Sequence, residues 1–298
     1  MQSVYADTLR WGRELKSGPT PCASRARRTV APLRVAREPH LLLSEMASAV
    51  ARKALERCFG KENVAPDQII VCATSFEHDL ALSCASRLHS ELKSKGAPFA
   101  LGQLQGVSFF LALQLVSDMM AQVDPIRCAL IVSAERWLPP FSRRVGSLTT
   151  FGDGAAAVLI RRDVGPGWYV LGIGLRTPSP PIAGAHLSSI DETTVVEVIE
   201  QTCAQARMAP EALDWILPPS INEALARSVS ARARLSGRMW YPHPNHAGFL
   251  CTADAPAQLD ALLRSAVASE GRCILLWSAG FQGQAACAIL QYRGARDV

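Results

Sequence analysis

The sequence lacks the features that mark membrane, secreted and metal-binding proteins. None of its apolar stretches reaches the roughly 18 residues of a membrane-spanning helix, and its start has no apolar core of a secretion signal. Nine cysteines are present but none are spaced C-x-x-C, so we expect neither a zinc site nor a disulfide framework. His243 and His246 are three residues apart with no third ligand nearby, so no metal is expected. The default expectation is a cytoplasmic protein.

Charge is unevenly distributed. Residues 1–38 hold eight basic and three acidic residues, which accounts for the whole formal net charge of +5. We therefore expect residues 1–40 to form a basic N-terminal arm, with a short helix over residues 5–15. The arm is interpreted as a solvated segment or, alternatively, as a patch that attracts phosphates or an acidic protein. Trp11 is the single aromatic residue among the arginines and no nucleic-acid motif accompanies them, so nucleic-acid binding is not expected.

Apolar runs of strand length are abundant. Residues 155–160 form a run of small and β-branched residues, which is typical of a strand buried on both faces. Residues 128–135 form a second run, and we expect the two to be neighbouring central strands. The segment 151–154, Phe-Gly-Asp-Gly, predicts a turn in which the Asp153 carboxylate accepts hydrogen bonds from backbone N–H groups.

Strand and helix patterns alternate along the rest of the chain. Ser44 is a candidate N-cap for a helix that ends at Gly60. Two α/β halves are expected, at 41–162 and 163–298, divided near the linker 161–167. The expected strands are 69–74, 168–175, 214–217 and 273–280, and the expected further helices are 81–95, 107–120 and 192–206.

These motifs, in this order, resemble the ketoacyl synthase III branch of the thiolase superfamily. The resemblance rests on an apolar strand ending Ser-Ala-Glu, the Phe-Gly-Asp-Gly-Ala motif, and two later stretches, residues 214–222 and 253–280. It covers roughly residues 40–290. It implies a thiolase fold: two α/β halves in pseudo-twofold relation, arranged in five α-β-α-β-α layers. It also implies chemistry on acyl groups that are carried as thioesters of coenzyme A or of acyl carrier protein.

The residues that the family uses for catalysis are missing. The resemblance places the nucleophile, normally cysteine, at Gly106, the histidine at Pro219 and the third residue, asparagine or histidine, at Phe249. None of these can carry an acyl group or transfer a proton. The glycine-rich turn that supplies an oxyanion amide is represented by residues 280–283 in altered form. We therefore expect a degenerate catalytic centre.

Other residues are candidates for binding or for substitute chemistry. Cys251 and His246 are considered as a relocated nucleophile and base, although a packed thiol is the simpler interpretation of Cys251. Phe109, Asn222 and Gly280 are candidate substrate-binding residues, although an apolar residue at helical spacing such as Phe109 more often belongs to the core.

The favoured hypothesis is a non-catalytic subunit that supports an active ketosynthase partner in fatty-acid or polyketide-type biosynthesis. The alternative is an acyltransferase or synthase that works without the usual cysteine; a third is a protein that only binds an acyl thioester. The expected ligand is the phosphopantetheine thioester of coenzyme A or acyl carrier protein, with no bound cofactor. As the resemblance implies, we expect a homodimer, or a heterodimer with an intact ketosynthase.

Overall fold

The structure is a computed structural model. It describes the backbone of residues 3–9 and, with side chains, residues 35–62, 64–77, 79, 81–122, 125–162, 165–178, 190–240, 248–265 and 269–294. Strands and helices alternate through both halves of the chain, as their apolar patterns predict.

The strands form one sheet with the order β10-β9-β11-β12-β8-β1-β7-β4-β2-β3, plus a small pair, β5-β6. Five sheet strands come from each half of the chain, and the halves join where β1 pairs with β8. The bounds are β1 Ser3–Leu9, β2 Gln68–Cys72, β3 Phe99–Leu101, β4 Cys128–Glu135, β5 Arg144–Val145, β6 Thr149–Thr150, β7 Gly154–Arg161, β8 Gly167–Arg176, β9 Trp215–Leu217, β10 Arg238–Met239, β11 Cys273–Ala279 and β12 Ala285–Arg293.

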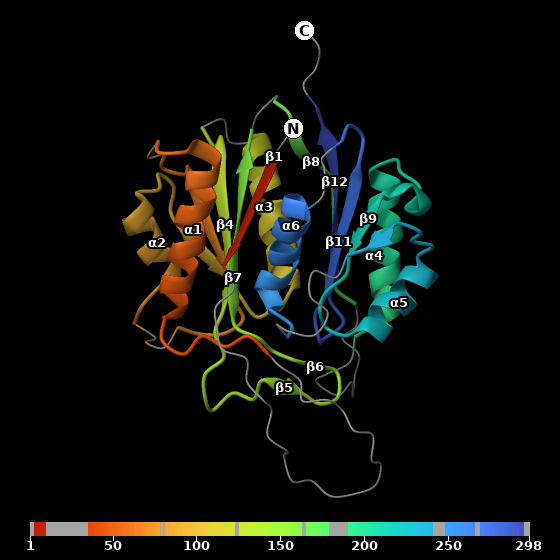
Figure 1. Ribbon diagram of the computed structural model, residues 1–298, viewed down its shortest axis with the longest axis horizontal. Coiled ribbons are helices and arrows are strands. Elements are labelled where there is room, and N and C mark those ends of the chain that lie inside the picture. The colour runs from red at the N-terminus through yellow and green to blue at the C-terminus, as the bar shows by residue number, and fades with distance from the viewer. Residues whose placement is uncertain are drawn as a thin grey trace, which may run out of the picture.

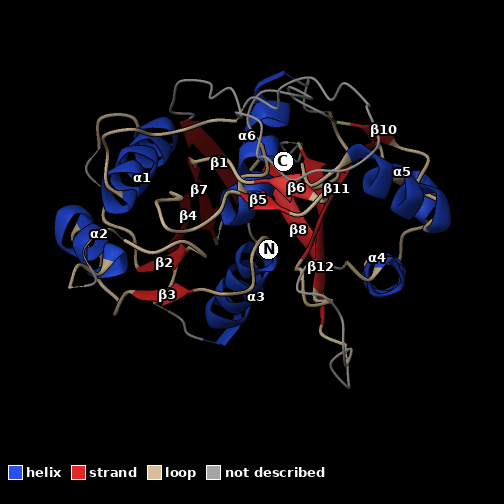
Figure 2. Ribbon diagram, turned by 90° about the horizontal axis from the view of Figure 1, so that it is seen from below, coloured by secondary structure: helices blue, strands red, loops and turns tan. Residues whose placement is uncertain are grey.

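The helices make three layers around the two halves of the sheet. The helices α1 and α2 cover one outer face, α4 and α5 cover the other, and α3 and α6 lie between the halves (Figures 1 and 2). This is the predicted five-layer arrangement. The helix bounds are α1 Leu43–Phe59, α2 Cys84–Leu92, α3 Val107–Gln122, α4 Glu192–Gln205, α5 Glu223–Arg232 and α6 Asp254–Ser265, with short 3-10 turns at Pro210–Ala212 and Cys251–Ala253.

In both halves an aspartate before one strand accepts hydrogen bonds from the backbone at the start of a neighbouring strand. Asp67 stands just before β2, and its carboxylate accepts from the backbone N–H groups of Arg127 and Cys128 at the start of β4. Asp214 stands just before β9 and accepts in the same way from Cys273 at the start of β11. In each half the aspartate therefore fixes the register of two parallel strands.

Two local predictions are wrong. The helix expected over residues 5–15 is wrong over residues 5–9, because Ser3–Leu9 is a strand paired with β7, and its remainder, like most of the basic arm, lies outside the described residues. A short segment has no clear period of its own, and the sheet decides its conformation. The Ser44 cap is also wrong, since α1 begins at Leu43. Glu45 accepts from the N–H of Leu42, and Glu77 accepts from those of Leu43 and Ser44.

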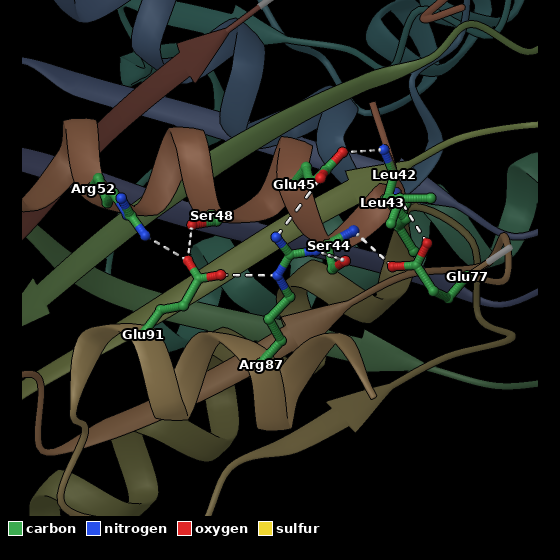
Figure 3. A network of polar contacts seen from close by, with 9 residues as sticks. All are labelled: Leu42, Leu43, Ser44, Glu45, Ser48, Arg52, Glu77, Arg87 and Glu91. Carbon is green, nitrogen blue, oxygen red and sulfur yellow. Dashed lines mark hydrogen bonds and ion pairs between the residues drawn. The ribbon is translucent and has the colours of Figure 1, made fainter. Parts of the chain in front are cut away.

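Charged side chains bind α1 to α2 (Figure 3). The Glu91 carboxylate on α2 accepts from Arg87 at 2.8 Å, from Arg52 on α1 at 2.6 Å, and from the hydroxyl of Ser48. Partial burial acts to raise the pKa of Glu91, but the three donors outweigh it and lower that pKa to about 2. The network therefore stabilises the α1–α2 contact while Glu91 is ionised.

We expect Glu91→Gln to make the free energy of unfolding depend less on pH in the acidic range. The folded pKa of Glu91, about 2, lies below its ordinary value of 4.5, so the wild-type contribution is fully present above pH 4.5 and is lost as the pH falls toward 2. Because the network is partly exposed, the loss at neutral pH should be about 1 kcal/mol or less. Urea unfolding of both proteins between pH 7 and pH 3 should show their difference shrinking below pH 4.5. A constant difference would contradict this assignment.

Candidate functional site

Four segments that are far apart in the sequence meet at one place. They are the N-terminus of α3, the end of β11, the turn over residues 280–283, and residues 249–251 before α6. We call this place the central junction. It brings together two of the three positions where the resemblance expects catalytic residues, Gly106 and Phe249.

The Phe-Gly-Asp-Gly segment, residues 151–154, supports the junction from one side. The fully buried Asp153 carboxylate accepts from the backbone N–H groups of Glu38 and Trp137, both at 2.9 Å. Arg143 donates to both of its oxygens at 2.7 Å. The prediction that Asp153 accepts from backbone donors is confirmed, and every lone pair of this carboxylate is engaged in holding loops together. The predicted turn is wrong, because Phe151 bridges to Phe249 and β7 already begins at Gly154.

The space beside Gly106 is occupied. A Cβ added there would lie 2.1 Å from the hydroxyl oxygen of Ser278 and 3.4 Å from the carbonyl oxygen of Cys251. Ser278 is 2% exposed, and its hydroxyl has no hydrogen-bond partner among the described residues. The strand β11 thus fills the position that a side chain at 106 would need.

This contact predicts a coupled pair of substitutions. Gly106→Ala should lower the free energy of unfolding by about 1–3 kcal/mol, because its methyl group overpacks against Ser278. Adding Ser278→Gly should recover part of that loss, which a double-mutant cycle of urea unfolding would measure. Additive effects of the two substitutions would show that the side chains do not compete for the same space.

Aromatic rings surround Phe249. Its side chain is fully buried, and its ring lies 6.0 Å from that of Phe151 and 6.2 Å from that of Phe281. Trp137 stacks on Phe151 at 4.1 Å. Where the resemblance expects an amide or imidazole, the junction holds four packed rings that offer dispersion contacts and no proton transfer.

Pro219 follows β9 and is buried. The pairing of β9 with β11 ends at Leu217 and Leu276, and Pro219 lies two residues beyond that end of β9. Asn222 is the N-cap of α5, and its side-chain oxygen accepts from the N–H of Leu225 at 2.8 Å. That oxygen is therefore used for helix capping.

A backbone N–H group in the turn over residues 280–283 already has a hydrogen-bond acceptor from the protein. The N–H of Phe281 donates to the side-chain oxygen of Gln105 at 3.2 Å. A Cβ added at Gly280 would lie 3.0 Å from that same oxygen and 2.6 Å from Oε1 of Gln284. Protein oxygens thus crowd the turn that the resemblance associates with an oxyanion amide.

Cys251 is packed and not poised for reaction. Its side chain is fully buried, and its thiol donates to Thr74 at 3.5 Å. Burial raises its pKa well above the usual value, and the nearby Glu135 carboxylate raises it further. Burial also raises the pKa of Glu135, although hydrogen bonds from Thr74, Ser75 and Thr252 oppose it. The thiol is therefore protonated near neutral pH and a poor nucleophile.

The remaining candidates lie elsewhere. Phe109 is 2% exposed and packs edge-on against Phe110 at 5.4 Å, within the core beneath α3. His246 and His243 lie outside the described residues. In the part of the chain that the structure describes, no cluster of three or more metal-ligating side chains occurs, and no helix is long and apolar enough to cross a membrane.

Gln105, Ser278 and the ring of Phe281 reach the central junction without having been expected there from the sequence. The contacts of these residues are tertiary, so neighbours in the sequence do not reveal them. One signal was available: the pair Ser133-Ala134 near the end of β4 recurs as Ser278-Ala279 at the end of β11. This repeat indicates that Ser278 lies near the end of a central strand.

Known proteins match both the sequence and the fold. The family model of 3-oxoacyl-[acyl-carrier-protein (ACP)] synthase III matches residues 103–179. The beta-ketoacyl-[acyl-carrier-protein] synthase III of Citrobacter koseri is 24% identical over 266 residues, which cover 81% of this chain and 82% of the relative.

Solved structures extend the match over nearly the whole chain. The acyltransferase ChlB3 has a TM-score of 0.80 at 17% identity and covers 98% of this chain and 97% of its own. The synthase III of Pseudomonas aeruginosa has a TM-score of 0.75 at 17% identity, with 99% coverage of both chains. The tetronic acid condensing enzyme AbyA1 has a TM-score of 0.76 at 16% identity and covers 97% and 99%. The chain therefore has the fold of the synthase III structures, and its residues 103–179 match the synthase III family model.

Proposed function

We propose that this chain is a non-catalytic subunit that supports an active ketosynthase in acyl-thioester metabolism of the fatty-acid or polyketide type. The observation that carries the proposal is the filled central junction. Gly106, Pro219 and Phe249 lack reactive groups, and Ser278, Gln105 and the aromatic rings occupy the space around Gly106 and Phe249. A centre that had merely lost its side chains would leave room for substrate; this one is packed as core.

The enzyme alternative needs a nucleophile elsewhere. Cys251 is the described candidate, but its thiol is buried and its pKa is raised, so it is protonated at neutral pH. Acyl transfer by positioning alone would need a cavity for the thioester beside a base. The packing around Phe249 therefore favours the supporting role over the acyltransferase role.

The partner is proposed to be an intact ketosynthase that takes its acyl group from coenzyme A or acyl carrier protein. The strand β3 ends the sheet, so its outer edge has no strand beside it among the described residues. An unpaired edge is suited to pairing with a strand of a second subunit. A cytoplasmic location and contact of the basic arm with the partner or carrier remain predictions.

Co-expression with a candidate ketosynthase tests the proposal. We expect the two chains to co-purify and radiolabelled acyl-coenzyme A to label only the partner's cysteine. We also expect the partner's turnover or product chain length to change when this chain is omitted. Robust condensation or acyl transfer by this chain alone would overturn the proposal, as would a partner whose output is identical with and without it.

A further inference from the structure

A strained turn links β3 to α3 and presents Gln105. The backbone torsion φ is +68° at Gln103 and +48° at Gln105, values that residues with a Cβ rarely adopt. Gly106 follows, and α3 begins at Val107. The turn therefore places the Gln105 side chain just before the N-terminus of a 16-residue helix, where partial positive charge favours an oxygen atom.

A backbone N–H from the second half of the chain donates to the same side chain. Its oxygen accepts from the N–H of Phe281 at 3.2 Å, inside the tight turn over residues 280–283. The unpartnered, 2% exposed hydroxyl of Ser278 points at the adjacent Gly106. The helix end and the turn amide together suit a carbonyl oxygen, and the half-buried carboxamide of Gln105 occupies that place, while the Ser278 hydroxyl stays without a partner among the described residues.

We propose that Gln105, and not Gly106, stands at the former reactive position and that its carboxamide oxygen substitutes for the thioester carbonyl. The resemblance alone places that position at Gly106, but a side chain there would point into Ser278. The side chain at 105 points at the turn amide instead. This inference rests on the proposed function. If the chain were acylated during its work, the carbonyl oxygen of the acyl group would need the place that the Gln105 carboxamide fills.

The inference has a chemical consequence for Gln105→Cys. The shorter cysteine side chain vacates the place that the Gln105 carboxamide fills at the Phe281 N–H, so a thioester carbonyl can enter there. The introduced thiol would lie at the α3 N-terminus, which lowers its pKa. Its thiolate attacks the carbonyl carbon of an acyl-coenzyme A thioester, and the developing oxyanion accepts the Phe281 N–H. The bond between that carbon and the coenzyme A sulfur breaks. Coenzyme A leaves as a thiolate and takes up the proton that the introduced thiol released, so the acyl group ends on the protein as a new thioester.

Two measurements on the full chain test the inference. In hydrogen exchange, Gln105→Ala should speed exchange of the Phe281 amide by roughly tenfold, the effect of one lost hydrogen bond. The matched control Gln114→Ala, on the exposed side of α3, should leave it unchanged. In intact-mass spectrometry with acetyl-coenzyme A, Gln105→Cys should gain an acetyl group, whereas Gly106→Cys and the double variant Gly106→Cys/Ser278→Gly should not.

The possible outcomes separate the two proposals. Unchanged exchange in Gln105→Ala would overturn the inferred carbonyl surrogate. An adduct on a Gly106→Cys variant but not on Gln105→Cys, or on none of them, would overturn position 105 as the reactive position. Acylation of the wild-type chain would instead overturn the proposed non-catalytic function. The intact mass of the unsubstituted protein gives that result, so it does not depend on any of the variants.

Discussion

Asp153→Asn is expected to lower the free energy of unfolding by about 3–5 kcal/mol, the usual result of removing one partner of a buried ion pair. The carboxylate is fully buried, and the side chain of Arg143 beside it is only 16% exposed. Asparagine keeps the shape but leaves the Arg143 guanidinium without its countercharge. It also offers an amide group where the backbone N–H groups of Glu38 and Trp137 need acceptors.

Urea unfolding measures this change, with Asp118→Asn as the matched control. Asp118 lies on the exposed side of α3 and bonds only Gln114 in the described contacts, so its loss should stay within about 0.5 kcal/mol. Equal midpoints for the two variants would show that Asp153 does not organise the loops around the central junction.

Phe249→Asn restores the residue type that the family uses, yet it should destabilise the protein by about 3–5 kcal/mol without creating activity. The fully buried ring leaves a cavity among Phe151 and Phe281, and the new amide is buried in apolar surroundings. Calorimetric or urea unfolding measures the loss, and acyl-coenzyme A hydrolysis measures activity.

The exposed Phe76, 54% accessible, supplies the control for that substitution. Phe76→Asn removes the same ring and adds the same amide at the surface, so it should change stability by less than about 0.5 kcal/mol. If Phe249→Asn were as stable as Phe76→Asn, the junction would be a solvent-filled pocket and not packed core. The argument for a closed centre would then fail.

Much of the fold could be predicted because its central elements carry their own signals. The strand β4 has the predicted bounds, β7 extends the predicted run by one residue at each end, and the two pair as expected. Gly60 ends α1 with a positive φ of 64°, as its lack of a Cβ suggests. A buried strand and a helix end at glycine are determined by the residues within the element itself, so the local sequence suffices to predict them.

The errors have the opposite cause. The strand β1 is fixed by its neighbours β7 and β8, and the start of α1 is capped by Glu77 from another loop. Likewise, the sequence showed that Gly106 and Phe249 lack reactive groups but not what replaces them. That answer depends on Ser278, Gln105 and Phe281, which reach the junction only through the tertiary fold.

The central claim is that this chain has a closed centre and forms no acyl-enzyme by itself. Intact-mass spectrometry of the purified wild-type chain, after incubation with short- and long-chain acyl-coenzyme A and acyl carrier protein thioesters, tests it most directly. We expect the mass to stay that of the unmodified chain throughout. A stoichiometric acyl adduct, with peptide mapping that places it on Cys251 or any other residue, would contradict the claim and make the chain an enzyme with a relocated nucleophile.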